Sequence, residues 1–178
     1  YSITVEDTAS FWDAGEFIAV SNKLEVPHPP GAPFYLILGR IFSFFAFGNL
    51  EKIALAINFL SVVSSAFTIL FLFWTITYLT SKIIKTDNQK GILLVLISGL
   101  TGALSFTFTD SFWFSAVEAE VYAMSSFFTA FVFWAILRWE SSENISNQNR
   151  WIILIAYMMG LSIGVHLLNL VAIPALAL

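Results

Sequence analysis

Residues 53–79, which read IALAINFLSVVSSAFTILFLFWTITYL, decide the fold because they contain no charged residue. About 20 apolar residues in a helix are enough to cross the hydrocarbon core of a bilayer. Similar uncharged stretches occupy 91–109 and 121–137, and a fourth begins at Trp151 and runs to about Leu170. The sequence therefore predicts an all-α, polytopic transmembrane helical bundle with about four full spans.

The composition agrees with a membrane protein. Apolar residues make up 58% of the 178 residues and charged residues 11%, whereas a soluble domain carries about 25% charged residues. The absence of a basic tract argues against nucleic-acid binding, and the absence of cysteine excludes disulfide scaffolds and Cys-ligated metals. We expect one transmembrane domain over 1–178, taken from a longer protein, because the chain starts without Met and ends in the apolar stretch 167–178.

A fifth apolar segment, 34–50, is interrupted by Arg40. Its length nearly spans a bilayer, and we interpret it as an interfacial or re-entrant helix. A charge within an apolar helix is costly and is usually paired or functional. Arg40 is therefore expected to meet a phosphate anion or a nearby carboxylate.

The charges in the polar connections orient the chain. Connections 80–90 and 138–150 hold five of the eight Lys and Arg residues, which are enriched in cytoplasmic loops. Segments 1–52 and 110–120 then face outward, and they hold nine of the twelve acidic residues. Polar connections carry charge in any membrane protein, but this clustering of acids on one face is what a site would require.

Asp13 and Glu16 form the first candidate site, within Phe11–Ala19 (FWDAGEFIA). Their spacing of three places both carboxylates on one face of a helix. Aromatic neighbours at a membrane interface would desolvate them and raise the pKa of each, which suits a base that takes a proton from a hydroxyl. The alternative is a plain helix start, with Asp13 as N-cap and Glu16 as its capping-box partner.

His28 lies in the proline-rich segment 26–33 (VPHPPGAP). Proline fixes φ and lacks an N–H, so this segment is expected to be a rigid, non-helical turn. A fixed imidazole can hydrogen-bond a phosphate or a carboxylate, or relay a proton. The alternative is that the prolines only redirect the chain from one helix to the next.

Glu118 and Glu120 lie in the second outward segment, 110–122 (DSFWFSAVEAEVY). Side chains two apart diverge on a helix, so these carboxylates converge only if the stretch is extended or bent. Paired carboxylate oxygens can hold a hard divalent cation such as Mg²⁺ or Mn²⁺. The aromatic residues around them, Trp113 above all, are also typical of an interfacial belt.

His166 and Asn169 lie in the last predicted span. At about 1.5 Å per residue from Trp151, His166 lies about 22 Å along the helix, towards the acidic face. The alternative is a structural histidine that is hydrogen-bonded to a neighbouring helix. Gly160 and Gly164 are expected to form a small-residue face for close helix packing.

Four motifs resemble those of one known family, the domain of unknown function 2723, which is common in bacteria. They are FWDAGEFIA at 11–19, HPPGAP at 28–33, FWFSAVEAEVYA at 112–123 and GLSIGVHLLN at 160–169. That family is similar to protein O-mannosyltransferases and other GT-C membrane glycosyltransferases. The motifs occur in family order across nearly the whole chain. The resemblance implies that a first transmembrane helix and a C-terminal part are absent from this sequence.

The resemblance also implies a function. Such enzymes take a sugar from a polyprenyl-phosphate carrier in the bilayer and pass it to a protein or glycan acceptor on the outer face. Asp13 matches the position of the general base, with Glu16 beside it, and Glu118 and Glu120 would orient the acceptor or hold a metal. The expected residues for the substrate and its phosphate are His28, Arg40, His166, Asn169 and Tyr122. The implied location is the bacterial inner membrane, with the acidic loops in the periplasm.

Two other classes of function are open at this point. A transporter or channel subunit would explain an arginine and a histidine within the membrane, and a non-catalytic scaffold would need no site. Neither explains carboxylates and a proline-rich turn gathered on one face. Geometry discriminates between them, because a glycosyltransferase needs Asp13 beside an outward cavity, whereas a transporter needs a polar path to both faces.

Overall fold

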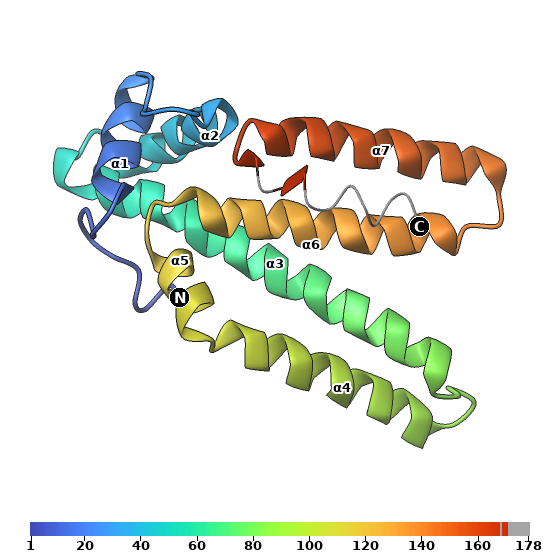
Figure 1. Ribbon diagram of the computed structural model, residues 1–178. Helices are drawn as coiled ribbons and strands as arrows, with labels where there is room; N and C mark the ends of the chain where they lie inside the picture. The colour runs from blue at the N-terminus through green and yellow to red at the C-terminus, as the bar shows by residue number, and fades with distance from the viewer. Residues whose placement is uncertain (168, 171–178) are drawn as a thin grey trace.

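A computed structural model describes residues 1–167, 169 and 170. Four long helices form an antiparallel bundle (Figure 1), namely α3 (Ile53–Ile83), α4 (Gln89–Thr107), α6 (Val121–Glu140) and α7 (Ile145–Ile163). Three short helices lie at one end of it, namely α1 (Ala14–Lys23), α2 (Pro33–Ser43) and α5 (Asp110–Val117). The predicted all-α class is confirmed, since no strand occurs among the described residues.

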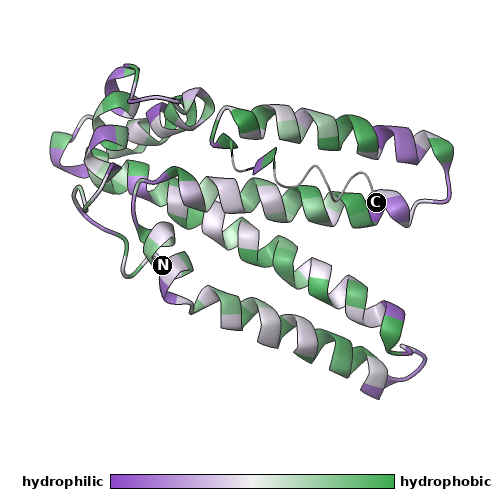
Figure 2. Ribbon diagram, viewed as in Figure 1, coloured by the Kyte–Doolittle hydropathy of each residue, from purple (hydrophilic) through white to green (hydrophobic). Residues whose placement is uncertain are grey.

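Three segments are long and apolar enough to cross a membrane: Leu50–Ile83, Gln89–Thr107 and Val121–Glu140. They correspond to three of the predicted spans. Figure 2 shows that hydrophobic residues follow these helices, while the hydrophilic ones gather at the connections and at the ends of the bundle. A bundle whose outer surface is apolar suits a lipid surround, where the helix satisfies its own backbone groups.

The fourth predicted span starts at the wrong residue. The side chain of Asn144 accepts a hydrogen bond from the backbone N–H of Ser146 at 2.8 Å, so α7 begins before Trp151. The first turns of α7 are therefore polar and include Arg150. Within the described residues, α7 is not among the segments that qualify as membrane spans, because its apolar part is shorter than the required length of about 20 residues.

The fourth span also ends earlier than predicted. α7 stops at Ile163, and the carbonyl of Gly164 accepts a hydrogen bond of 2.8 Å from the backbone N–H of Phe34. His166 therefore lies beyond the helix, in the chain that turns back towards α6. A Cβ at Gly164 would lie 3.0 Å from Phe34, whereas nothing lies within 4 Å of one at Gly160, so only Gly164 makes the predicted close contact. The predicted domain 1–178 also includes 168 and 171–178, which lie outside the described residues.

The segment 34–50 forms a short helix and two single turns instead of one continuous helix. After α2 come η1 (Phe44–Ala46) and η2 (Leu50–Lys52), and between them Phe47 and Gly48 have φ values of 49° and 82°. The apolar piece Pro33–Ala46 is too short to be a span and lies beside α1 at the end of the bundle (Figure 1). This position agrees with the interfacial interpretation.

The two basic connections lie together at one end of the bundle, and α1, α2 and α5 lie at the other (Figure 1). Lys82 Nζ is 3.5 Å from Glu140 Oε2, which joins the last turns of α3 and α6. The grouping of segments is thus the predicted one. Which end faces the cytoplasm stays a prediction.

Buried side chains hold the start of α1 against the rest of the bundle. Phe17 of α1, Tyr35 of α2, Leu60 of α3 and Met124 of α6 belong to one apolar cluster. Close packing of such side chains gains van der Waals contacts, which hold helices together in a lipid surround. The cluster therefore fixes the N-terminal end of α1 relative to the segment that leads into α6.

Candidate active site

Asp13 and Glu16 lie at the N-terminal end of α1, as predicted, but they do not cap the helix. Asp13 is the residue before the first turn, and its side chain makes no capping hydrogen bond. The carboxylate of Glu16 accepts a hydrogen bond of 2.7 Å from the backbone N–H of His28, and its other oxygen lies 2.8 Å from His28 Nδ1. The capping-box alternative is therefore wrong, because Glu16 binds the proline-rich turn.

His28 lies between the two carboxylates. Its Nδ1 faces Glu16, and its Nε2 is 3.9 Å from Asp13 Oδ2. The hydrogen bond with Glu16 raises the pKa of His28 above its ordinary value, and the same contact lowers the pKa of Glu16. The turn therefore places an imidazole that favours its charged form beside Asp13.

The donor atoms of Asp13, Glu16 and His28 lie within 4.8 Å of one another. Such a set of ligand types is compatible with a transition-metal ion. However, both oxygens of Glu16 are already bonded to His28, so the cluster is accounted for as a hydrogen-bonded ion pair. We assign no metal ligand to it.

The segment between α5 and α6 has extended backbone at Glu118 and at Glu120 and bends between them, where the backbone N–H of Glu120 donates to the carbonyl of Glu118 at 2.9 Å. An extended or bent segment is the condition under which the two carboxylates can converge. Glu118 has φ −130° and ψ 161°, and Glu120 has φ −129° and ψ 149°. Each residue is 4% exposed. Ser10 Oγ donates a hydrogen bond to Glu118 Oε2, so the N-terminal segment is fastened to this pair. Among the described residues, no third metal-type ligand joins the pair.

Asp13 and the two buried glutamates line one cavity of about 570 Å³. Asp13 and the 118–122 segment, which the charge pattern assigned to the same face, therefore share one cavity. The complete lining comprises Trp12, Asp13, Asp110, Ser111, Phe114, Ser115, Glu118, Glu120 and Tyr122. This volume falls within the range of about 300–1,000 Å³ that small-molecule sites occupy.

The electrostatic character of the cavity is acidic, and no Lys or Arg among the described residues lines it. Burial, reinforced by the charges of Glu118 and Asp13, raises the pKa of Glu120 to about 7. Burial also raises the pKa of Glu118. The side chain of Asp13, in contrast, is 54% exposed, so the carboxyl groups of one cavity have unlike environments.

Arg40 is not part of this cavity. Its Nη1 donates to the side-chain oxygen of Asn22 at 2.9 Å and to the carbonyl of the same residue, and its guanidinium lies 4.8 Å from the centre of the Phe44 ring. The predicted carboxylate partner is not found among these contacts. Arg40 instead fastens α2 to the end of α1, because Asn22 lies in the last turn of that helix.

His166 and Asn169, which were predicted near the end of the last span, lie in different surroundings. The ring of His166 lies 5.6 Å from that of Tyr122, which itself lines the cavity. Asn169 is buried, accepts a hydrogen bond from Ser125 Oγ and donates one of 3.1 Å to the carbonyl of Ser162. Asn169 therefore ties the chain after α7 to α6 and does not reach the cavity.

The contribution of α5 to the cavity was not expected from the sequence. Ser111 and Ser115 are spaced i and i+4, with Phe114 between them, and residues with this spacing lie on one face of a helix. Interpreting 110–117 as a helix instead of a connection would have placed all three on the cavity side.

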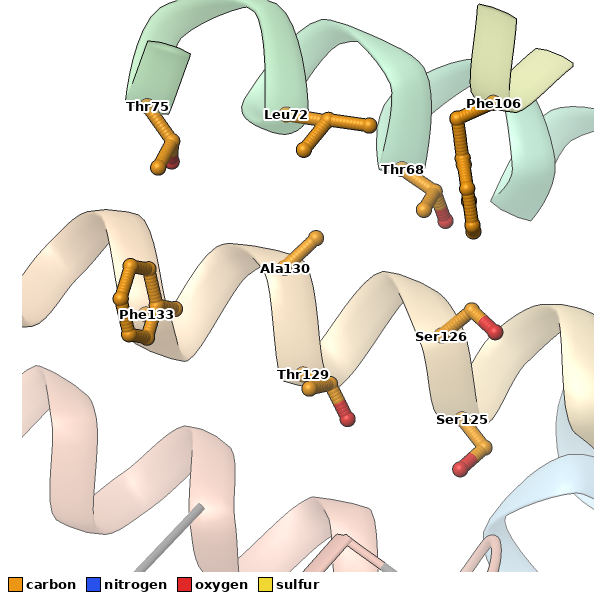
Figure 3. Close-up of a pocket in the computed structure, with 9 residues that line it drawn as sticks. All are labelled: Thr68, Leu72, Thr75, Phe106, Ser125, Ser126, Thr129, Ala130 and Phe133. Atoms are coloured by element: carbon orange, nitrogen blue, oxygen red, sulfur yellow. The ribbon is translucent and has the colours of Figure 1, made fainter. Parts of the chain in front are cut away.

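A second cavity, of about 390 Å³, lies between the membrane-spanning helices (Figure 3). Thr68 and Thr75 of α3 lie opposite Ser126 and Ala130 of α6 across it, and no charged residue lines it. Thr68 Oγ1 donates to the carbonyl of Ser64 at 2.9 Å within its own helix. Hydroxyls in this arrangement help helices to pack but provide no base near neutral pH, so the acidic cavity is the place for chemistry.

The chain is similar to proteins of one known family. A family model described as the protein O-mannosyl-transferase TMEM260 N-terminal domain matches residues 13–178. The chain is 30% identical to the protein O-mannosyl-transferase tmem260 of Dictyostelium discoideum, over 98% of this chain and 21% of that protein. It is 24% identical to the protein O-mannosyl-transferase TMEM260 of Mus musculus, over 92% of this chain and 21% of that protein. No solved structure matches.

These comparisons confirm some of the predicted relationships and correct others. The likeness to O-mannosyltransferases is confirmed, but the matching model does not carry the label domain of unknown function 2723. A multi-pass membrane protein is supported, whereas a bacterial inner membrane is not, because both relatives are eukaryotic. The chain spans about a fifth of the length of these relatives.

Proposed function

The chain belongs to the family of protein O-mannosyl-transferase TMEM260 N-terminal domains, and on this basis we propose that it carries the reacting groups of a membrane glycosyltransferase. The enzyme transfers a hexose, mannose by analogy with its relatives, from a polyprenyl-phosphate carrier to a hydroxyl group of a protein acceptor. Transfer takes place on the membrane face opposite the basic connections. A lipid-linked donor and transfer at one membrane face are compatible with an enzyme of the GT-C type.

One observation carries the proposal: Asp13 opens into the same cavity as the buried pair Glu118 and Glu120. Asp13 takes the proton from the acceptor hydroxyl as the sugar is transferred. Its half-exposed side chain makes no capping bond and so can reach a substrate. A positioned base of this kind contributes about 10²–10⁴ in rate.

The remaining predicted residues have supporting roles in this proposal. His28, whose pKa is raised by the contact with Glu16, lies 3.9 Å from Asp13 and provides positive charge for the carrier phosphate when it is protonated. Tyr122 and His166 contact each other beside the cavity and bind the sugar or its phosphate. The contacts of Arg40 and Asn169 give both of them structural roles instead.

Enzyme action fits the described residues better than transport does. The segments 53–79, 91–109, 121–137 and 151–163 contain no charged residue, and the cavity between α3 and α6 is lined only by hydroxyl and apolar side chains. Ion pathways through membranes are usually marked by ionisable residues. Nine of the twelve acidic residues are instead gathered in segments 1–52 and 110–120 at one end, where a carrier headgroup and a protein acceptor can meet.

The proposal is tested with the full-length protein in membranes, supplied with a labelled polyprenyl-phosphate mannose and candidate acceptor proteins. We expect the label to enter protein from the lipid-linked donor and to be released by treatment that cleaves O-linked sugar. A parallel reaction with a nucleotide-linked mannose and no polyprenyl phosphate should give no transfer. Transfer from the nucleotide sugar alone, or from neither donor, would reject the proposed donor class.

A further inference from the structure

Glu118 and Glu120 are two nearly buried carboxyl groups to which no nearby lysine or arginine is paired among the described residues. Among the described residues, the basic partners in ion pairs are Lys23, Lys82 and His28, and none of them is paired with Glu118 or Glu120. Two like charges that share a desolvated site cannot both form at low cost. The pair is therefore expected to retain one proton at neutral pH.

The proton is best placed on Glu120. Glu118 accepts a hydrogen bond from Ser10 Oγ, which stabilises its charged form, and faces the charge of Glu6. Glu120 accepts the backbone N–H groups of Asp13 and Val121, but it faces two further charges, those of Glu118 and Asp13, in addition to its burial. Five titratable groups from the surrounding elements lie near Glu120. They are Asp13 at the start of α1, His28 in the proline-rich turn, Tyr35 on α2, Glu118 in the same segment and Asp110 across the cavity on α5. His28 is the one basic group in this set, and its closest contact is with Glu16.

The same cavity thus contains a half-exposed carboxylate and a buried carboxylic acid. Asp13 is 54% exposed and opens towards solvent, while Glu120 is 4% exposed. Environments that separate two carboxyl groups in this way allow one to act as a base and the other as an acid. The raised pKa of Glu120, about 7, agrees with this division.

We infer that Glu120 is the acid of the transfer reaction, donating its proton to the phosphate oxygen that leaves the sugar while Asp13 takes the proton of the acceptor. This inference rests on the proposed function and adds a catalytic residue to it. Because the lining contains no lysine or arginine among the described residues, the proposed function gives the departing phosphate only histidine and tyrosine partners, and a proton adds to their effect. A proton from Glu120 neutralises the charge that develops on the oxygen.

The step balances in atoms and charge. The bond between the anomeric carbon and the carrier phosphate oxygen breaks, and its electron pair stays on that oxygen, which receives the proton of Glu120. A bond forms between the anomeric carbon and the acceptor oxygen, whose proton goes to Asp13. Asp13 then returns a proton to Glu120, through solvent that reaches its exposed side chain, and the site is restored.

The first test needs no turnover. In infrared spectra of the full-length protein in membranes, the difference between wild type and Glu120→Gln should show a carboxylic-acid C=O band at about pH 6 that is lost by about pH 8. Glu118→Gln is the matched variant. It removes a neighbouring negative charge, so the pKa of Glu120 should fall and the band should disappear at lower pH. Absence of the band in wild type at about pH 6 would overturn the inference.

The second test is the pH dependence of transfer. Glu120 is protonated below its pKa, so wild-type turnover should decline as the pH rises above about 7, and Glu118→Gln should move this decline to lower pH. Glu120→Gln should lose about 10²–10⁴ in rate together with the alkaline decline, whereas Glu120→Asp should keep the decline. An unchanged decline in Glu120→Gln overturns this role alone. Absence of transfer by wild type at every pH overturns the proposed function and this role with it.

Discussion

Asp13, Glu16 and His28 show how neighbouring polar residues acquire different tasks. Glu16 holds His28 through both a backbone and a ring nitrogen, while Asp13 keeps its side chain free of capping bonds. Asp13 is therefore available to a substrate. Glu16 acts through the position and charge of His28.

We expect Glu16→Gln to lower the pKa of His28 measurably in the full-length protein. The carboxylate of Glu16 is the main cause of the raised pKa, and glutamine removes its charge while keeping an acceptor for the backbone N–H of His28. An NMR titration of His28 against pH measures the shift. Asp13→Asn is the control and should change the pKa less. Equal shifts in the two variants would show that the Glu16 contact is not the dominant one.

The contact between Glu16 and His28 also determines in which direction the stability of the fold changes with pH. A histidine whose pKa is raised on folding favours the folded state fully below its unfolded pKa, near 6.5. This contribution is lost as the pH rises through the folded-state pKa. The side chains of His28 and Glu16 are 47% and 36% exposed, so solvent screens the pair. The effect on the unfolding midpoint should therefore be small and should be abolished by His28→Asn.

At the residue scale, the sequence predicted which acids would meet but not how the histidine would be held. Charge patterning placed the segment of Asp13 and the segment Glu118 to Tyr122 on one face. Their proximity could therefore be predicted. The contact between Glu16 and His28 depends on how the proline-rich turn folds back over α1. Spacing and composition carry no information on that path.

Among the elements, α1 and α2 set the geometry of the site because they pack closely. A Cβ at Gly39 of α2 would lie 2.6 Å from the hydroxyl of Ser21 on α1, and Ser21 is fully buried. The two helices therefore approach through a glycine, and Arg40 reinforces the contact through Asn22. Any separation of α1 from α2 moves Asp13.

Gly39→Ala should therefore destabilise the full-length protein by about 1–3 kcal/mol, the cost of overpacking a close contact. The measurement is thermal or denaturant unfolding in detergent. The matched control is Gly160→Ala on α7, where nothing lies within 4 Å of the new Cβ and stability should stay equal or rise slightly. Similar losses in both variants would show that the α1 and α2 contact is not specifically tight.

A helix could be predicted from the sequence where the length of an uncharged apolar run is enough to identify it as a membrane span. The uncharged run 53–79 is long enough to fix α3 as a span without further information. α7 was misplaced because its bounds depend on local hydrogen bonds, namely the Asn144 cap at its start and the contact between Phe34 and Gly164 at its end. α5 was missed because an eight-residue helix in a polar connection has little periodicity to detect.

In the whole molecule, the acidic segments and the basic connections lie at opposite ends of one bundle (Figure 1). The arrangement places the cavity of Asp13, Glu118 and Glu120 at the end where α1, α2 and α5 gather. The positive-inside rule assigns the other end to the cytoplasm.

Cysteine labelling tests this sidedness. This chain contains no cysteine, so Ser111→Cys on α5 and Ser142→Cys in the α6–α7 connection can be compared in a full-length protein with no other cysteine. A membrane-impermeant reagent applied to sealed vesicles should label the two positions from opposite sides. Labelling of both from the same side would reject the topology.

The measurement that bears most directly on the site is the transfer rate of Asp13→Asn against Glu16→Gln in full-length protein. Asparagine is nearly isosteric with aspartate but cannot take a proton, so Asp13→Asn should lower turnover by about 10²–10⁴ with an unchanged unfolding midpoint. Glu16→Gln should cost less, since its amide oxygen can still accept the backbone N–H of His28. Near-normal turnover in Asp13→Asn, or a larger loss in Glu16→Gln, would contradict the assignment of Asp13 as the base.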